Sequence, residues 1–352
     1  MDQTAANSSR SGPPVFVSLG MLVLDELRFP HLKTVADVPG GSGLYATLGA
    51  RLFKPGPSAA DVGCVIKAGY DIPESTVRLL ESWEMTLLLV READKQCTRG
   101  LLEYEDEDLI HNTFNYTTPP LRPAPSDLQT SPLLFAKSFH FLSLPVDLER
   151  QVASLLQLRA EQGIHERPLI VWEPAPMGCD SINLASHFSA CALVDVISPN
   201  RAELRFLLEG KDKSQVEFSQ SIVEAQAARF VEAGIGPTQE GLIVVRAGEH
   251  GVLILSKTRK AEWLPTYYGK DDSDKVIDAT GAGNAFLGAF AVTLQETKDP
   301  REAALRGSVA SSYALEQFGP PKLTTSPSGE ELWNESAVMS RLNNLKTRVA
   351  RG

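Results

Sequence analysis

The nine residues 278–286, DATGAGNAF, decide how this chain is interpreted. Gly281 and Gly283 tolerate positive φ and allow the backbone to approach a ligand closely. The run AFLGAFAVTL, residues 285–294, is apolar on nearly every side and predicts a buried helix. Free N–H groups and the helix dipole favour an anion at such a helix start. We therefore predict an anion site between a strand, KVIDA at 275–279, and a buried helix.

Asn284 closes this loop and has two interpretations. It is an active-site position without the usual carboxylate, or it is only a helix cap, because asparagine caps about as well as aspartate. Other nucleotide motifs are weak: there is no GxxxxGK[ST], and Phe286 stands where a GxGxxG fingerprint needs its third glycine. The loop alone does not decide between the two interpretations.

Composition limits the class of protein. The chain has 352 residues, of which 43% are apolar and 22% charged, as in a globular protein with a substantial core. The net charge of −10 argues against nucleic acid or anionic membrane as a partner. Four cysteines lack a CxxC pair, and six histidines lack metal-ligand spacing. Without a signal peptide or an apolar run of about 20 residues, we expect a reduced, cytoplasmic protein.

Apolar strands alternate with helical segments along almost the whole chain. Strands are predicted within 14–27, 61–71, 85–90, 168–174, 192–200, 241–248 and 251–256, and helices within 40–53, 151–162, 221–233 and from Arg201. This alternation predicts an α/β fold whose mostly parallel sheet is covered on both faces.

Three segments depart from the alternation. Residues 91–125 are polar, acidic at 103–108 and proline-rich at their end, which is equally typical of a protruding lid and of a solvated loop. Residues 1–14 read as a disordered tail, and 325–352 as a C-terminal appendage with one amphipathic helix around 335–347. The main domain is then 15–324.

Taken in order, several motifs resemble the PfkB family of carbohydrate kinases. These are GMLVLD at 20–25, GGSGLYATLGARLF at 40–53, SPNRAEL at 198–204, VVRAGEHGVLI at 244–254 and the loop itself. The match runs from about Val15 to Pro321 and is most similar to the fungal maintenance-of-killer PfkB-like group. It implies a three-layer α/β/α ribokinase-like fold with a small β lid at about 91–118.

The resemblance also implies roles for particular residues. Gly281, Ala282 and Gly283 would form the anion hole, with Asn284 at the base position. Cofactor-binding positions would be Asn200, Glu203, Arg246, Gly248, Gly251 and Thr280. Asn200 and Glu203 would hold Mg²⁺ through water, and Asp278 with Thr280 a monovalent cation such as K⁺. Substrate would contact Asp25, Gly40, Gly41 and Tyr45.

Each role has a structural alternative. Asp25 could cap the turn after a strand, and the Gly40–Gly41 pair could make a helix-entry turn. Asn200 and Glu203 also have the spacing of a capping box, which is compatible with the metal role.

Three positions depart from the family pattern. Asn284 stands where the family has the aspartate that takes the proton from the attacking hydroxyl, and a neutral amide cannot do this. General-base catalysis contributes roughly 10²–10⁴-fold, so we expect binding to persist while turnover falls. Tyr45 stands where the family commonly has asparagine, and Glu173 where it often has aspartate.

The hypothesis is a kinase-like protein that binds Mg-ATP at 278–286, with phosphoryl transfer to a small-molecule hydroxyl weak or lost. One alternative is an active sugar or nucleoside kinase that tolerates Asn284, and another is a non-catalytic scaffold for protein partners. Asn284→Asp would raise turnover a hundredfold or so under the hypothesis and change little in an active kinase. The expected ligand is a sugar or nucleoside-like molecule, and the lid could pair two chains into a homodimer.

Overall fold

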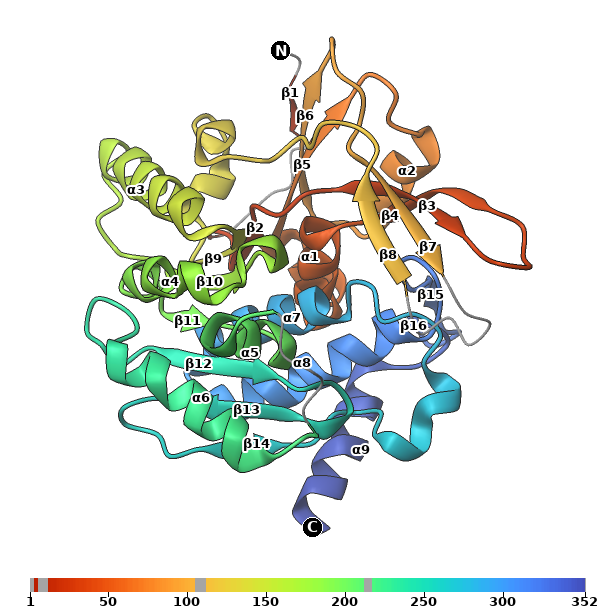
Figure 1. Ribbon diagram of the computed structural model, residues 1–352. Helices are drawn as coiled ribbons and strands as arrows, with labels where there is room; N and C mark the ends of the chain where they lie inside the picture. The colour runs from red at the N-terminus through yellow and green to blue at the C-terminus, as the bar shows by residue number, and fades with distance from the viewer. Residues whose placement is uncertain (1–2, 6–11, 105–111, 212–216, 352) are drawn as a thin grey trace.

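The computed structural model describes residues 3–5, 12–104, 112–211 and 217–351, and its centre is a ten-stranded sheet (Figure 1). Strands β6 to β12 in spatial order are parallel, and the edge pairings β1–β6, β12–β13 and β13–β14 are antiparallel. In spatial order the strands are β1 Gln3–Ala5, β6 Thr86–Glu92, β5 Val62–Gly69, β2 Phe16–Ser18, β9 Ser138–Ser143, β10 Leu169–Pro174, β11 Val196–Ile197, β12 Leu242–Arg246, β13 Val252–Leu255 and β14 Glu262–Leu264.

Helices cover both faces of this sheet, which confirms the predicted three layers. Side chains alternate along β12: Val244 packs into one hydrophobic core, and Ile243 and Val245 into the other. The first core contains residues of α1 Ser42–Leu52, α2 Glu74–Ser82, α7 Ala282–Thr297, α8 Pro300–Leu315 and α9 Val338–Arg351. The second contains residues of α3 Pro145–Glu161, α4 Leu184–Cys191, α5 Arg201–Glu209 and α6 Gln220–Ala233.

Helix α7 begins within residues 278–286, the segment that we name the anion loop after its predicted role, and is held rigidly against α1. Its residues 285–294 are all buried, as predicted from their apolar character. A Cβ on Gly288 would lie 1.7 Å from the carbonyl oxygen of Ala46, and one on Gly49 would lie 1.9 Å from that of Ala285. Only glycine allows the two helix backbones to approach this closely, so the loop rests on a fixed base.

A second, four-stranded sheet forms the lid and stands apart from helices α3–α6 in Figure 1. Its order is β4 Val35–Gly40, β3 Val23–Arg28, β7 Arg99–Tyr104 and β8 Asn112–Tyr116. The predicted lid at 91–118 supplies β7 and β8, but residues 23–40 supply the other half. The single strand expected within 14–27 is therefore wrong: it divides into β2 and β3 because the chain leaves the main sheet after Ser18.

The strand predicted at 275–279, before the anion loop, is also wrong. Val276 and Ile277 are 38% and 42% exposed and belong to no strand. The amides of Ile277 and Asp278 instead donate to the carbonyl oxygen of Leu315 at the end of α8, at 2.7 and 3.2 Å. The apolar pair suggested a buried strand, but its backbone hydrogen bonds go to a helix end.

The C-terminal segment consists of the hairpin β15 Leu323–Thr325 and β16 Glu331–Trp333, followed by α9. Trp333 is fully buried against Trp83, with ring centroids 5.9 Å apart. Arg51, also fully buried, pairs with Glu331 at 2.8 Å. These contacts join the segment to the core that contains α1 and α7.

At the other end of the chain, residues 3–5 of the predicted tail form strand β1, which pairs with β6. Residues 1–2 and 6–11 of that tail lie outside the described part of the chain. Within the described ranges, no helix is long and apolar enough to cross a membrane.

Candidate functional site

A pocket of about 570 Å³ lies beyond the C-terminal ends of three parallel strands, β2, β9 and β10, and beneath the lid. Ligands of parallel sheets bind at this edge. Its wall includes Asp25 and Gly41, which the sequence assigns to the substrate side, and Thr280 and Asn284, which it assigns to the phosphate side. The fold therefore brings residues from the beginning and the end of the chain into one pocket.

The rest of the wall is largely apolar. It contains Leu19, Gly20, Met21, Val23, Ser42, Leu102, Phe114, Asn115, Tyr116, Arg122, Pro123, Leu142, Ser143, Leu144, Asp147, Gln151, Ala175, Pro176 and Met177. Gly40 and Tyr45 are not among these lining residues. The ring of Tyr45 is buried against Gly281, where a Cβ would lie 2.1 Å from the Tyr45 Cδ2 atom. The substrate contact expected of Tyr45 stays a prediction.

The anion loop enters α7 through Gly281, whose φ of 78° is left-handed. Helix α7 begins at Ala282, so Asn284 is its third residue and not its cap. The capping interpretation of Asn284 is thus wrong. Asp278 Oδ1 accepts hydrogen bonds from the Thr280 amide at 3.0 Å and its hydroxyl at 2.7 Å, which fixes the turn. The cation role of these two residues stays a prediction.

Glu173, at the end of β10, is the partner of Asn284. The Nδ2 group of Asn284 donates a hydrogen bond to Glu173 Oε2, and Arg246 Nη2 pairs with Glu173 Oε1 at 2.7 Å. His140 Nε2 lies 3.6 Å from Oε2. Burial by itself would raise the pKa of Glu173, but Arg246 and His140 outweigh it and hold the pKa below its ordinary value. Glu173 is therefore ionised at neutral pH.

Arg246 lies directly beneath the anion loop at the end of β12. Its Nη2 donates to the carbonyl oxygen of Ser198 at 2.9 Å and lies 3.8 Å from Glu203 Oε2. A Cβ on Gly283 would come within 2.0 Å of Arg246 Nη1, so glycine is required there for the guanidinium to fit. Arg246 thus links the loop to two buried carboxylates, and its nucleotide contact stays a prediction.

Asn200 and Glu203 form the predicted capping box at the start of α5. Asn200 Oδ1 accepts from the Glu203 amide at 2.8 Å, and Glu203 Oε2 accepts from the Asn200 amide at 2.7 Å. Burial raises the pKa of Glu203 to about 7, with Glu173 adding to the rise and Arg246 opposing it. The structural role is therefore present, while the predicted metal role is compatible with it.

The fit to Mg²⁺ depends on water. No three His, Cys, Asp or Glu side chains in the described part of the chain are arranged to hold a metal directly. Mg²⁺ commonly keeps several waters and uses one or two carboxylates plus substrate phosphates. Glu203, buried close to Arg246 below the anion loop, suits such a water-mediated contact.

Asp25, on lid strand β3, is a buried carboxylate of a different kind. Its Oδ1 has no hydrogen-bond partner within the described structure. Burial raises the pKa of Asp25 to about 7, and Asp278 contributes to the rise. Cβ atoms on Gly40 and Gly100 would lie 2.3 and 2.4 Å from its oxygens, so both glycines make room for the carboxylate. The group is left with acceptor capacity beside the pocket.

Gly248 and Gly251 lie in the turn between β12 and β13, with φ of 58° and 102°. Their expected nucleotide contacts stay predictions. The sequence analysis missed His140, on the unpredicted central strand β9, and its partner Ser18, whose Oγ lies 2.9 Å from His140 Nδ1. The only available signal was the apolar run around SFHFLS, residues 138–143.

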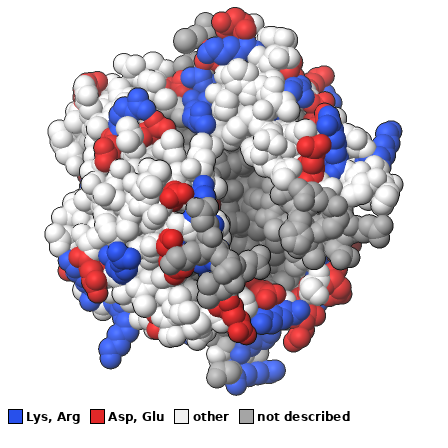
Figure 2. All heavy atoms as spheres, in the orientation of Figure 1, with Lys and Arg blue, Asp and Glu red and all other residues white. Residues whose placement is uncertain are grey.

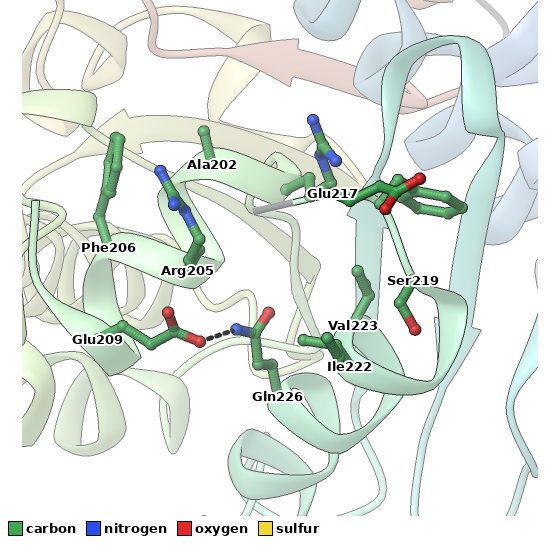
Figure 3. Close-up of a pocket in the computed structure, with 11 residues that line it drawn as sticks. Ala202, Arg205, Phe206, Glu209, Glu217, Ser219, Ile222, Val223 and Gln226 are labelled. Atoms are coloured by element: carbon green, nitrogen blue, oxygen red, sulfur yellow. Dashed lines mark hydrogen bonds between the residues drawn. The ribbon is translucent and has the colours of Figure 1, made fainter. Parts of the chain in front are cut away.

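A second pocket, of about 290 Å³, lies between α5 and α6 and is shown in Figure 3. Gln226 donates a hydrogen bond to Glu209 across it, at 2.8 Å. None of the residues predicted to form the site lines this pocket. Because predicted site residues line the larger pocket and not this one, we assign the candidate site to the larger pocket.

Acidic and basic side chains are interspersed over the described part of the face shown in Figure 2.

Comparison with known proteins agrees with this architecture. Residues 29–325 match the family described as pfkB family carbohydrate kinase. An uncharacterized protein of Schizosaccharomyces pombe is 32% identical, with 93% of this chain and 91% of that protein covered. Protein MAK32 of Saccharomyces cerevisiae is 27% identical, with coverages of 93% and 90%.

Among solved structures, a putative ribokinase II from E. coli in complex with ATP and Mg²⁺ superposes with a TM-score of 0.65 at 16% identity. The superposition covers 95% of this chain and 99% of that one, which shows a common fold. The family match and this likeness together show that the chain belongs to the pfkB family of carbohydrate kinases and has the ribokinase-like fold.

Proposed function

We propose that the protein binds Mg-ATP at the 278–286 loop and a small polyhydroxylated molecule in the adjoining pocket. The observation that carries this proposal is the shared wall of the pocket: Asp25 lies on the lid side, and Thr280 and Asn284 on the loop side. A hydroxyl held by Asp25 and a phosphate held by the loop amides would then face each other. This is the positioning on which phosphoryl transfer mainly depends.

The pocket favours a sugar or nucleoside-like acceptor. The free Oδ1 of Asp25 can accept a hydrogen bond from a hydroxyl group. The apolar part of the wall, which includes Leu102 and Phe114 of the lid, suits the flat or carbon-rich part of such a molecule.

Mg²⁺ would be held through water by Glu203 and Asn200, and it would neutralise charge on the nucleotide phosphates. Phosphoryl transfer itself is weak or lost. The amide of Asn284 can accept a hydrogen bond from the attacking hydroxyl but cannot take its proton. The loop amides and the positioning of the acceptor remain, which is why binding is expected to outlast turnover.

Calorimetric titration of the purified full chain with Mg·ATP tests the proposal without a guess about the acceptor. ADP with Mg²⁺ and ATP without Mg²⁺ are the matched controls. We expect micromolar binding that weakens at least tenfold when the metal is removed. No heat and no thermal stabilisation at millimolar nucleotide would contradict nucleotide binding and favour a scaffold for protein partners.

An active kinase that tolerates Asn284 is the second candidate. The loose transition state of phosphoryl transfer depends more on positioning than on proton removal. A variant with an ionised carboxylate at position 284 distinguishes the two candidate functions. Its turnover should be roughly a hundredfold higher than that of the native protein if the native protein lacks a catalytic base, and nearly the same if no base is needed. D-ribose and adenosine, each with Mg·ATP, are suitable first acceptors.

A further inference from the structure

One end of the Asn284 side chain is held by a charged partner. Glu173 uses both carboxylate oxygens: Oε1 pairs with Arg246 at 2.7 Å, and Oε2 accepts the hydrogen bond from Asn284. An ionised carboxylate has no proton to donate, so only the Nδ2 end of the amide can face it. The carbonyl oxygen of Asn284 must then lie at the opposite end of the planar amide.

The Asn284 side chain borders the pocket, and its charged partner does not. Asn284 lines the pocket wall with Thr280 and Asp25, whereas Glu173 is 6% exposed and is not among the lining residues. We infer that Glu173 is a positioning residue that holds the Asn284 amide with its carbonyl oxygen toward the acceptor hydroxyl. The statement that the carbonyl oxygen meets an acceptor hydroxyl rests on the proposed function. The contact between the side chains of residues 173 and 284, which we call their coupling, does not rest on it.

Because residues 173 and 284 are in contact, Asn284→Asp alone does not simply restore a catalytic base. The native pair carries one negative charge, on Glu173. An aspartate introduced at 284 would place a second carboxylate in hydrogen-bonding contact with the first. Two carboxylates in such contact do not both ionise readily, and the pair retains a proton. The hundredfold gain expected of Asn284→Asp from the sequence is therefore revised, because the new carboxylate would share its proton with Glu173.

The double substitution Glu173→Gln/Asn284→Asp avoids this conflict. It keeps one negative charge in the pair and moves it to position 284, where the glutamine amide can donate to it. The charged residues around the pair are kept in every variant: Arg246 on β12, His140 on β9 and Glu203 on α5. Because Glu173 helps to raise the pKa of Glu203, each Asn284→Asp protein is compared with a reference that has the same residue at position 173. The double variant is therefore the matched control for the single one.

The test is the thermal midpoint Tm of four full-chain proteins between pH 5.5 and 8: native, Glu173→Gln, Asn284→Asp and the double variant. In Asn284→Asp the folded pair keeps a proton that both carboxyls have lost in the unfolded chain. The folded state then binds more protons, so its stability falls as pH rises. We expect the Tm deficit of Asn284→Asp relative to the native protein to grow by about 3 °C or more over this range. The Tm of the double variant is compared with that of Glu173→Gln. The difference between these two Tm values should not grow over the same pH range.

Equal Tm effects of Asn284→Asp in both backgrounds, or an effect independent of pH, would overturn the coupling. If Glu173→Gln does not fold, Glu173→Asp replaces it. The shorter side chain withdraws the carboxylate from residue 284, and the pH-dependent deficit should shrink. Mg·ATP titration of the native protein is measured separately. Its failure would contradict the proposed function and leave the four-protein comparison intact.

Discussion

Glu173, which contacts the pocket residue Asn284, and Asp25, which lines the pocket itself, are buried to the same extent and differ in their partners. Glu173 is 6% exposed and Asp25 is 5% exposed. Glu173 has Arg246, His140 and Asn284 around it, and its pKa is lowered. One oxygen of Asp25 has no hydrogen-bond partner among the described residues, and burial together with Asp278 raises the pKa of Asp25 to about 7. Burial alone therefore does not decide whether a carboxylate is charged.

The contrast between these two carboxylates indicates that the two regions of the pocket have different roles. Beneath the anion loop, charges are balanced within the protein, and the geometry is fixed before any ligand arrives. Beneath the lid, one carboxylate lacks hydrogen bonds that the hydroxyl groups of a ligand can supply. Four substitutions test this contrast.

Arg246→Ala should have the largest effect, because it leaves Glu173 as an unpaired buried charge. Removal of one partner of a buried pair costs about 3–5 kcal/mol in the free energy of unfolding. Arg78→Ala is the control: its pair with Glu74 is exposed, with 62% of the Arg78 side chain accessible, and such pairs contribute about 0–1 kcal/mol. Denaturant titration measures both. Equal losses would mean that the region beneath the loop is not held by this pair.

Gly281→Ala should lower the free energy of unfolding by roughly 2–4 kcal/mol, because it combines a left-handed φ of 78° with a clash against Tyr45. Mg·ATP affinity should fall at least tenfold as the loop shifts. Gly269→Ala is a suitable control, since no atom lies within 4 Å of the added Cβ. Unchanged affinity in Gly281→Ala would argue against the loop as the nucleotide site.

Asp25→Asn should change stability in the opposite direction, by about 1–3 kcal/mol at pH 8. The pKa shift alone corresponds to roughly 4 kcal/mol, and the cost of a buried, unpaired amide offsets part of it. The pKa of Asp25 is about 7 in the folded protein, above its ordinary value of 3.8. The contribution of Asp25 to the stability of the native protein therefore falls as pH rises from about 4 to 7, and the amide variant lacks this loss. Its advantage in Tm should grow over this range and level off above it. Asp147→Asn, which makes the same chemical change at a pocket carboxylate that is 39% exposed, is the reference for the effect of burial.

Asn200→Ala should have the smallest effect, about 1 kcal/mol, because it removes one helix cap and leaves Arg246 paired with Glu173. Asn200→Ser, which keeps a capping oxygen, should recover most of that loss in chemical denaturation. A loss as large as that of Arg246→Ala would show that the cap and the ion pairs form one network.

Much of the fold could be predicted because its signals are local. The apolar run at 285–294 identified a buried helix, and the alternation of strands and helices identified the layered sheet. Asp25 and Asn284 were expected in one site through the family resemblance, since neither of them follows a strand of the main sheet. Local patterns failed where the partner is distant. Val276 and Ile277 looked like a strand, yet their segment is bonded to the end of α8.

The lid shows the same limit. Residues 23–28 read as the continuation of a core strand, because apolar composition does not say which sheet a strand joins. In the structure they pair with residues 35–40 and 99–103 instead.

The sequence by itself determined the α/β class, the glycine-containing loop that leads into a buried helix and the lack of a carboxylate at position 284, since each is written in adjacent residues. Only the tertiary structure decided what faces that amide. Glu173 is 111 residues away from Asn284 and reaches it from β10, while Arg246 reaches Glu173 from β12. The order of strands in a sheet sets such contacts, and it is fixed by long-range pairing that no local pattern specifies. The charge that orients Asn284 is therefore a property of the fold.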